Sequence, residues 1–365
     1  VPGLMQGGTT IVISPLISLM KDQVDQLQAM GIQAAYLNSS LTHKQQKEIE
    51  EQIKRGAIQF LYVAPERFEN TFFLNLLRKI EIPLIAFDEA HCISKWGHDF
   101  RPSYQSVIQK VFTLPQNFTI VALTATATAE VQQDIMSKLS IGQNDVVKTS
   151  TKRRNLIFKV NPTYQRQKFV VDYVANHEGQ AGIIYCSTRK QVEELHEALN
   201  SEKIKSTIYH AGLTNKERIE AQNDFLYDRV EVVIATNAFG MGIDKSNVRY
   251  VIHYNMPGDL ESYYQEAGRA GRDGLKSECI LLFSERDKGL HEYFITVSQA
   301  DDDYKDKMGE KLTKMIQYTK TKKCLEATIV HYFEPNENLE ECNQCSNCIQ
   351  ENKTYDMTRE AKMII

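Results

Sequence analysis

Short apolar runs and longer amphipathic stretches alternate along the first part of the chain. The apolar runs are rich in Ile, Val and Leu, and we expect them to form buried strands at residues 10–14, 59–64, 84–87 and 119–123. Between these runs, residues 16–30 and 42–54 have apolar positions at helical spacing. Alternation of buried strands with helices predicts βαβ units, and therefore a parallel sheet with helices on both faces.

The same alternation returns after residue 150. The joint, residues 148–154 (KTSTKRR), is polar and basic and has no Gly or Pro, which is typical of a short connection. Residues 304–333 then have a helical pattern. The sequence therefore predicts a second α/β domain and a small helical module. In the second domain we expect strands at residues 155–160, 182–185, 206–209, 230–235, 249–253 and 278–283, and helices near residues 189–200, 215–227 and 260–267.

Composition sets limits on the class of protein. The chain has 365 residues, 42% of them hydrophobic, which is enough for two cores and a small appendage. Its apolar runs are no longer than strands, and residues 1–4 lack the basic and apolar regions of a signal peptide, so we expect no membrane span. The formal net charge is -4. Because sequence-independent DNA binders are often basic overall, any contact with nucleic acid must come from local grooves.

Four of the seven cysteines gather near the C-terminal end, at Cys324, Cys342, Cys345 and Cys348. The last three are each separated by two residues, and four thiolates suit a tetrahedral metal ion. Without a secretion signal, a metal site fits this cluster better than disulfides. Zinc is favoured, and an iron–sulfur cluster is the alternative because closely spaced cysteines also suit iron.

An acidic pair follows the apolar run at residues 84–87. Asp88 and Glu89 begin the sequence DEAH, at the end of a predicted parallel strand, where α/β sheets bind ligands. Two adjacent carboxylates can divide the work of nucleotide hydrolysis: Asp88 would hold Mg²⁺ through water, and Glu89 would polarise the attacking water. Taken alone, the pair fits an acidic turn about equally well, because short motifs recur by chance.

Three further segments favour a nucleotide site. Residues 124–126 (Thr-Ala-Thr) follow another apolar strand, and their hydroxyls could bridge to the acidic pair. Arg269 and Arg272 lie at the end of a predicted helix, so they share a face and can reach a phosphate across a cleft. The glycines of residues 240–244 (GMGID) permit close backbone approach to phosphate or sugar. A solvated basic turn is the alternative for the two arginines.

These motifs, in this order, resemble those of superfamily 2 helicases. DEAH, TAT, ATNAFGMGID and QEAGRAGRDG look like motifs II, III, V and VI, and ISPLISLMKDQ, YVAPER and IIYCSTRKQVEEL look like motifs Ia, Ib and IV. Residues 92–104, CISKWGHDFRPSY, are similar to the aromatic-rich loop of the RecQ family of DNA helicases. The resemblance covers essentially the whole chain. It implies an ATP-dependent 3′→5′ DNA helicase of recombination and repair, with ATP, Mg²⁺ and Zn²⁺ as cofactors.

The resemblance also implies roles for single residues. The catalytic residues would be Asp88, Glu89, His91, Gln265, Arg269 and Arg272. The nucleotide-binding residues would be Asp88, Thr124, Thr126, Gly242, Asp244, Arg269 and Arg272. The family has a zinc module where the four cysteines lie, whereas iron–sulfur helicases of the superfamily carry their cluster inside the first motor domain. One departure is that Leu325 and Glu326 follow Cys324, where the family often has basic residues, which argues against DNA contact from that helix.

The chain's only tryptophan, Trp96, stands among polar residues. Because a core Trp usually has apolar neighbours, we expect Trp96 and Phe100 to stack on bases, at about 1–3 kcal/mol per base. Arg101 would add phosphate or cation–π contact, and a Trp packed beneath the loop is the alternative. Ordinary helix capping is an alternative for the Ser and Thr residues among the further expected contacts. These further expected DNA contacts are Ser14, Pro15, Arg67, Ser187, Thr188, His210, Thr236 and Asn237.

The expected fold is α/β, with two RecA-like parallel-sheet domains in tandem at residues 1–150 and 151–290. A small helical zinc-binding module would follow at residues 291–352, and the start of a winged-helix domain at 353–365. The partners would be single-stranded and duplex DNA, with a single-stranded-DNA-binding protein as a further candidate. We expect a monomer in the bacterial cytoplasm, associated with the nucleoid.

The chain contains no Gly-Lys-Ser or Gly-Lys-Thr, the Walker A signature with which nucleotide motors cradle phosphates. In the family this loop precedes the segment that begins here at Val1, so we expect a fragment that is inactive on ATP by itself. Residues 7–9 (Gly-Gly-Thr) are the first candidate for a substitute loop. Two other hypotheses stay open: a non-enzymatic nucleic-acid-binding or regulatory protein with an inactive ATP site, and an RNA helicase of the same superfamily.

Overall fold

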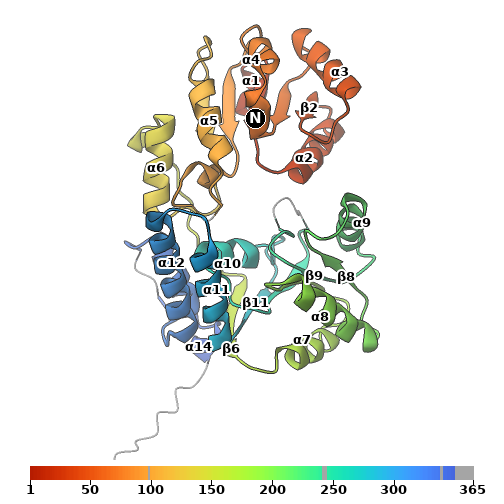
Figure 1. The fold of residues 1–365 in the computed structure, drawn as a ribbon, viewed down its shortest axis with the longest axis vertical. Coiled ribbons are helices and arrows are strands. Elements are labelled where there is room, and N and C mark those ends of the chain that lie inside the picture. Colours follow the sequence, from red (N-terminus) through yellow and green to blue (C-terminus); the bar gives the residue numbers. More distant parts are fainter. Residues whose placement is uncertain (98, 241–244, 338–339, 350–365) are drawn as a thin grey trace, which may run out of the picture.

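The chain forms two α/β units, one above the other, with a group of helices beside the second unit (Figure 1). The computed structural model describes residues 1–97, 99–240, 245–337 and 340–349. The expected start of a winged-helix domain at 353–365 lies outside these residues. The predicted fold class, two RecA-like parallel-sheet domains in tandem followed by a helical module, is confirmed.

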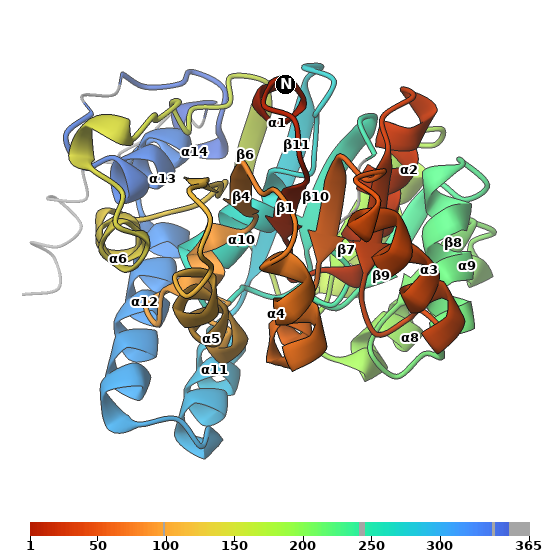
Figure 2. The ribbon, with the colours of Figure 1, turned by 90° about the horizontal axis from the view of Figure 1, so that it is seen from above.

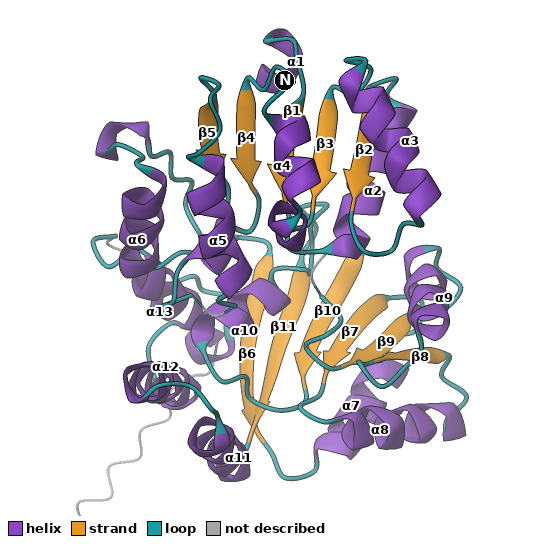
Figure 3. Cartoon of the chain, turned by 45° about the horizontal axis from the view of Figure 1, so that its top comes forward, coloured by secondary structure: helices purple, strands orange, loops and turns teal. Residues whose placement is uncertain are grey.

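The first domain is built on a parallel sheet with strand order β2-β3-β1-β4-β5 (Figure 3). Strand β2 was not expected, because its sequence AAYL has two alanines and gives a weak strand pattern. The strands are β1 (Thr10–Ile13), β2 (Ala34–Leu37), β3 (Phe60–Val63), β4 (Leu84–Phe87) and β5 (Thr119–Ala122). The helices are α1 (Pro2–Met5), α2 (Ile17–Ala29), α3 (His43–Lys54), α4 (Thr71–Leu77), α5 (Pro102–Val111) and α6 (Ala129–Leu139), with 3-10 turns η1 (Pro65–Glu69), η2 (Ala90–Ile93) and η3 (Gln143–Asp145).

The second domain is also parallel, with strand order β6-β11-β10-β7-β9-β8. All six of its expected strands are present. They are β6 (Leu156–Pro162), β7 (Ala181–Tyr185), β8 (Ser206–Tyr209), β9 (Val232–Ala235), β10 (Val248–His253) and β11 (Ser277–Phe283). Its helices are α7 (Arg166–Ala175), α8 (Arg189–Ser201), α9 (Asn215–Leu226) and α10 (Leu260–Ala267).

Local sequence signals explain several helix starts. Thr42 and Thr214 each make a capping box, in which the Thr hydroxyl accepts from the third helical residue and that residue's side chain accepts from the Thr amide. Thr128, Thr188 and Asp259 cap α6, α8 and α10 in the simpler way. These caps fix where each helix leaves its strand, and α10 is the helix that approaches the first domain.

The C-terminal helices lie against the edge of the second sheet. They are α11 (Glu285–Val297), α12 (Asp302–Lys320), α13 (Leu325–Phe333) and α14 (Ser346–Ile349), and α11 runs across the boundary expected at residue 290. One hydrophobic core joins Leu156 and Phe158 of β6 to Met315 of α12 and Ile329 of α13. Seen from above, α12 and α6 are neighbours, so the helical module also reaches the first domain (Figure 2). Among the described residues, no helix is both long enough and apolar enough to span a bilayer.

Candidate nucleotide cleft, aromatic loop and metal centre

The acidic pair lies where neighbouring strands β1 and β4 end. Ser14 follows β1, and its hydroxyl donates to Asp88 Oδ2 at 3.3 Å, while the Glu89 N–H donates to Asp88 Oδ1 at 3.0 Å. Burial raises the pKa of Asp88, the charge of Glu89 adds to this rise, and the two hydrogen bonds oppose it. A half-buried carboxylate beside a second negative charge is a favourable ligand for a divalent cation, so the pair fits Mg²⁺.

Glu89 has a left-handed backbone, with φ 47°. This conformation is uncommon for residues other than Gly and often marks a functional site. Its Oε2 lies 3.3 Å from His91 Nδ1, and the same nitrogen lies 3.2 Å from Thr124 Oγ1. His91 therefore links the acidic pair to the Thr-Ala-Thr segment, as the sequence suggested, although the link passes through the imidazole and not directly from hydroxyl to carboxylate.

The second domain faces this pair with the end of α10. Gln265 lies in the last turn of that helix, and Arg269 and Arg272 follow in the next turn of chain. Arg269 is buried, and a Cβ added to Gly240 would lie only 2.8 Å from Arg269 Nη2. A side chain at position 240 would therefore displace the end of the Arg269 side chain, and glycine permits the close packing seen here. Gly242 and Asp244 lie outside the described residues.

A cavity of about 570 Å³ separates the two domains. Glu89 and Thr126 line it from the first domain, and Gln265, Arg269 and Arg272 line it from the second. Its volume is within the range of small-molecule sites. The structure thus brings predicted residues from distant parts of the sequence to one cleft.

Other residues of this cleft were not predicted. Arg153 and Tyr264 line it, as do Asp22 and Gln23 of α2. Arg153 belongs to the basic joint between the domains, and Asp22 and Gln23 belong to the segment ISPLISLMKDQ. The sequence pattern identified these segments but did not indicate which of their side chains line the cleft.

Residues 7–9 do not reach this cleft. Gly7 and Gly8 have positive φ angles, as a phosphate loop could, but they precede β1, whereas Asp88 follows the parallel strand β4. The Thr9 hydroxyl donates to Ile58 O at 2.8 Å, and a Cβ on Gly8 would lie 2.7 Å from Glu81 O. Gly8 packs closely against Glu81 at the end of the parallel strands opposite Asp88, so residues 7–9 are not a substitute phosphate loop at this cleft.

The aromatic loop lies against helix α12. Trp96 is half-buried, and the Nζ atoms of Lys95 and Lys307 each lie 5.8 Å from its ring centroid. Lys311 Nζ donates to Trp96 O at 2.8 Å. The Arg101 guanidinium bonds to Asp99 Oδ2 and, at 2.9 Å, to Pro15 O. The ring is therefore partly packed and partly exposed, and its stacking on bases remains a prediction.

Several other expected DNA contacts already have partners within the protein. The Ser14 N–H donates to Val63 O, and the Ser187 N–H donates to Asn255 Oδ1 at 3.0 Å. In this conformation neither amide is left for a phosphate. The remaining residues are placed as follows: Thr188 caps α8, Arg67 pairs with Glu50, His210 is buried, Thr236 and Phe100 are half-buried, and Asn237 is exposed.

The four clustered cysteines bring their sulfur atoms together. Cys345 Sγ lies 3.4 Å from Cys348 Sγ and 4.0 Å from Cys324 Sγ, and Cys342 Sγ lies 3.9 Å from Cys348 Sγ. Tetrahedral zinc with four thiolates at about 2.3 Å would place them roughly 3.8 Å apart. The N–H groups of Leu325, Cys342 and Cys345 donate to these sulfurs at 3.2–3.4 Å, which stabilises thiolates. The cluster therefore fits a zinc ion.

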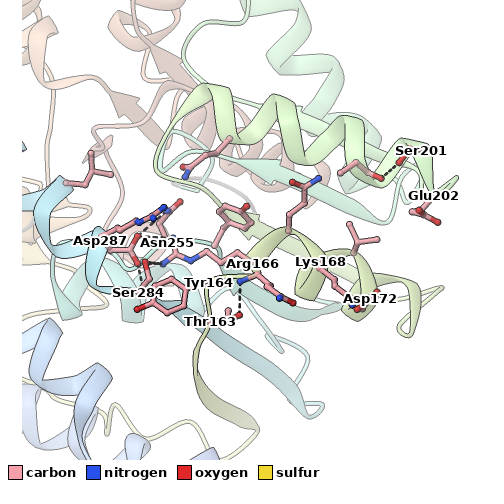
Figure 4. Close-up of a pocket in the computed structure, with 18 residues that line it drawn as sticks. Thr163, Tyr164, Arg166, Lys168, Asp172, Ser201, Glu202, Asn255, Ser284 and Asp287 are labelled. Atoms are coloured by element: carbon pink, nitrogen blue, oxygen red, sulfur yellow. Dashed lines mark hydrogen bonds and ion pairs between the residues drawn. The ribbon is translucent and has the colours of Figure 1, made fainter.

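A second cavity, of about 1060 Å³, lies elsewhere in the second domain (Figure 4). It opens between α7, α8 and the start of α11. Its buried acid Asp287 already pairs with Arg166 and also accepts from Asn255 Nδ2 at 3.3 Å. No predicted site residue lines this cavity. It shares no lining residue with the cavity between the two domains.

Comparisons with known proteins agree with this division of the chain. The family "DEAD/DEAH box helicase" matches residues 3–135, "Helicase conserved C-terminal domain" matches residues 165–274, and "RecQ zinc-binding" matches residues 285–349. The ATP-dependent DNA helicase RecQ of Bacillus subtilis is 47% identical over 365 residues, covering 100% of this chain and 61% of that protein. The chain spans about 60% of the length of the bacterial relatives it matches.

Two further comparisons bear on the nucleic acid. A putative ATP-dependent RNA helicase of Acanthamoeba polyphaga mimivirus is 37% identical over 379 residues, covering 100% of this chain and 68% of that protein. A solved structure of S. cerevisiae Dbp5 bound to RNA and ADP BeF3 has a TM-score of 0.61 at 19% identity, covering 84% of this chain and 82% of that one. At that identity the likeness shows the fold alone.

Proposed function

This chain belongs to the RecQ family of ATP-dependent DNA helicases, and from that premise we propose that it supplies the ATP-hydrolysing and DNA-moving parts of such an enzyme. It hydrolyses ATP between its two α/β domains, moves 3′→5′ along single-stranded DNA and separates duplex strands. Recombination and repair in the bacterial cytoplasm, at the nucleoid, is the cellular setting that fits this activity. It works as a monomer, with a single-stranded-DNA-binding protein as a candidate partner.

The observation that carries this proposal is the cleft with Glu89 on one wall and Arg269 and Arg272 on the other. An acid and two arginines on separate domains can act on the same phosphate only when the domains hold a nucleotide between them. Such an arrangement makes hydrolysis depend on the distance between the domains, and anything that moves the domains is coupled to hydrolysis.

The residues divide the chemistry in a physically consistent way. Asp88 holds Mg²⁺, which supplies charge neutralisation for the phosphates, and Glu89 polarises the attacking water. His91, between Glu89 and Thr124, orients the acid. Arg269 and Arg272 stabilise the negative charge that develops on the transferred phosphoryl group, and Gln265 lines the same wall.

The aromatic loop couples DNA binding to this cleft. The loop begins directly after the acidic motif, so a base stacked on Trp96 and a water held by Glu89 are connected by a few residues of backbone. Stacking is tolerant of sequence, as a motor that moves along DNA requires. The net charge of -4 fits a motor that must release DNA in each cycle.

An RNA helicase is the second candidate, because the mimivirus relative bears that description. The RecQ zinc-binding match and the higher identity to bacterial DNA helicases favour DNA. The discriminating experiment uses the protein expressed from its own gene, with ATP and Mg²⁺, on duplexes of DNA and RNA that carry a 3′ or a 5′ single-stranded tail. We expect unwinding of the 3′-tailed DNA. Preference for RNA would support the second candidate, and absence of ATP hydrolysis stimulated by either DNA or RNA would contradict both.

A further inference from the structure

The turn that carries the two arginines is held by a third arginine from outside the motif. Arg153 lies in the joint between the domains, just before β6. Its Nη1 donates to Gly268 O at 3.3 Å, and its Nη2 donates to Ala270 O at 3.1 Å and to Gly271 O at 2.9 Å. One planar guanidinium thus bonds to three backbone carbonyls at and beyond the C-terminal end of α10.

Gly268 is the C-cap residue of α10, and Ala270 and Gly271 lie in the turn that follows. A cation at a helix C-terminus also interacts favourably with the helix dipole. Gly268 and Ala270 flank Arg269 in the sequence, and Gly271 directly precedes Arg272. Fixing the carbonyls therefore fixes the backbone from which both arginine side chains extend.

Asn155 completes the same support. Its Nδ2 donates to Gly271 O at 2.8 Å and to Leu275 O at 3.0 Å, and Arg153 Nε lies 3.4 Å from its Oδ1. Gly271 has φ 57°, and a Cβ there would lie 2.5 Å from Asn155 Nδ2. The backbone of this turn is therefore closely packed against Asn155, the residue directly before β6.

The joint itself is tied to the helical module. The Thr151 N–H donates to the carboxylate of Glu334, at the end of α13, at 2.8 Å. Thr151 O accepts from the hydroxyl of Tyr264 on α10. The joint is the only covalent connection between the domains. A rotation of one domain against the other therefore changes the backbone conformation of the joint or breaks its hydrogen bonds.

We propose that Arg153 is a positioning residue for ATP hydrolysis, which holds Arg269 and Arg272 at the distance from Glu89 that the reaction needs. The inference rests on the proposed function, since it assigns a role in that reaction. Arg153 acts through the turn of residues 268–271 and links the position of the two arginines to the joint. A lysine cannot replace it, because a single ammonium group cannot donate to three carbonyls in this planar arrangement.

The test compares Arg153→Lys and Arg153→Ala with Arg154→Ala, a neighbouring arginine whose side chain is exposed. DNA-stimulated ATP hydrolysis is measured on the protein expressed from its own gene. Because a displacement of about 1 Å can cost roughly 10²-fold in rate, we expect kcat to fall by about 10- to 100-fold in both Arg153 variants, with KM for ATP changed less than about threefold. Arg154→Ala should retain the wild-type kcat.

A second measurement separates positioning from loss of folded protein. The Kd of a non-hydrolysable ATP analogue and the Kd of ADP with aluminium fluoride, which mimics the transferring phosphoryl group, are determined for each variant. Positioning predicts that Arg153→Ala weakens only the second complex, by about the same factor as kcat. A variant that merely folds less well would bind both ligands with unchanged Kd and reduced stoichiometry.

Three results overturn the inference. One is a kcat within twofold of wild type in Arg153→Ala. Another is a large rise in KM that Arg153→Lys restores, which would make Arg153 a direct charge contact for the nucleotide. The third is an unchanged Kd for both ligands. If the wild-type protein itself shows no DNA-stimulated hydrolysis, the proposed function fails and this inference fails with it, which is a distinguishable outcome.

Discussion

The two α/β domains share a parallel architecture but differ at the outer edge of the sheet. In the first domain the edge strand is β5, where Thr119 is exposed and Leu123, just after the strand, is 53% exposed. In the second domain the edge strand β6 is covered by the cysteine-rich segment. The Val160 N–H donates to Ser346 Oγ, and the Gln344 side chain donates to Leu156 O. Among the described residues, the β6 edge of the second sheet lies beside the cysteine cluster, whereas β5 of the first sheet carries an exposed side chain.

The hydrophobic cores repeat this difference. The buried core cluster of the first domain consists of residues from that domain alone. One of the two core clusters that the described residues form in the second domain continues through α12 and α13 to Cys324 and Cys345, and the other does not. The free energy of zinc binding is therefore coupled to the folding of the second domain and not to that of the first. Domains of one fold class can thus obtain their stability from different sources.

The largest effect that we expect comes from removing the metal. Cys345 is fully buried and its sulfur lies near two other thiols, so Cys345→Ser should abolish binding of about one zinc ion per chain. Structural zinc contributes roughly 10–16 kcal/mol to small sites, and even part of this exceeds the stability of an ordinary domain. We expect hydrogen exchange to accelerate in β6 and β11 and to remain slow in β1 and β4.

Cys186→Ser provides the matched control, because Cys186 is a buried cysteine outside the cluster. This variant should keep its zinc, as measured by metal analysis. Equal loss of protection in both sheets after zinc removal would show that the two domains do not differ in the way proposed. Iron in place of zinc in the purified protein would contradict the assignment of the metal.

The second prediction changes function in the first domain without changing its stability. Glu89→Gln preserves the size of the side chain but removes the carboxylate that polarises water. General acid–base groups contribute about 10²–10⁴-fold, so kcat for ATP should fall by that factor while ATP and DNA still bind. The exposed Glu81→Gln is the control. Turnover within a few-fold of wild type would contradict the role of Glu89, and a lowered melting temperature would mean that its φ of 47° depends on the charge.

The sequence predicts some residues of the site and not others. Glu89, Thr126 and the arginines, which line one cleft, could be assigned to one site because strand ends and a motif order have recognisable patterns. Arg153 could not, because its partners are backbone carbonyls, which have no sequence signature. The contact of Lys311 with Trp96 joins residues 215 positions apart, and no local pattern encodes such a contact.

The third prediction concerns that contact, where the first domain meets the helical module. Lys311 pairs with Glu261 of α10 at 3.0 Å, and both side chains are almost fully buried. Lys311→Met would leave the Glu261 charge buried without this partner, at a cost of about 3–5 kcal/mol. We expect a lower melting temperature, partly restored by adding Glu261→Gln. Lys314→Met, at an exposed position of the same helix, should have little effect. Equal destabilisation by both substitutions would mean that the buried ion pair between α12 and α10 is not the source of the effect.

The smallest effect should come from Trp96, whose ring is half-buried between lysines and adjoins the core of the first domain. Because Lys311 bonds to the backbone oxygen and not to the ring, Trp96→Ala leaves that contact in place. The variant should therefore lose about 1–3 kcal/mol of DNA affinity, equivalent to one stacked base, and most of the stimulation of ATP hydrolysis by DNA. ATP binding and the melting temperature should change little.

Trp96→Phe keeps an aromatic face and should restore part of the stimulation. If Trp96→Ala instead lowers the melting temperature and leaves DNA stimulation intact, the ring is a packing residue. The first domain would then need another contact to sense DNA.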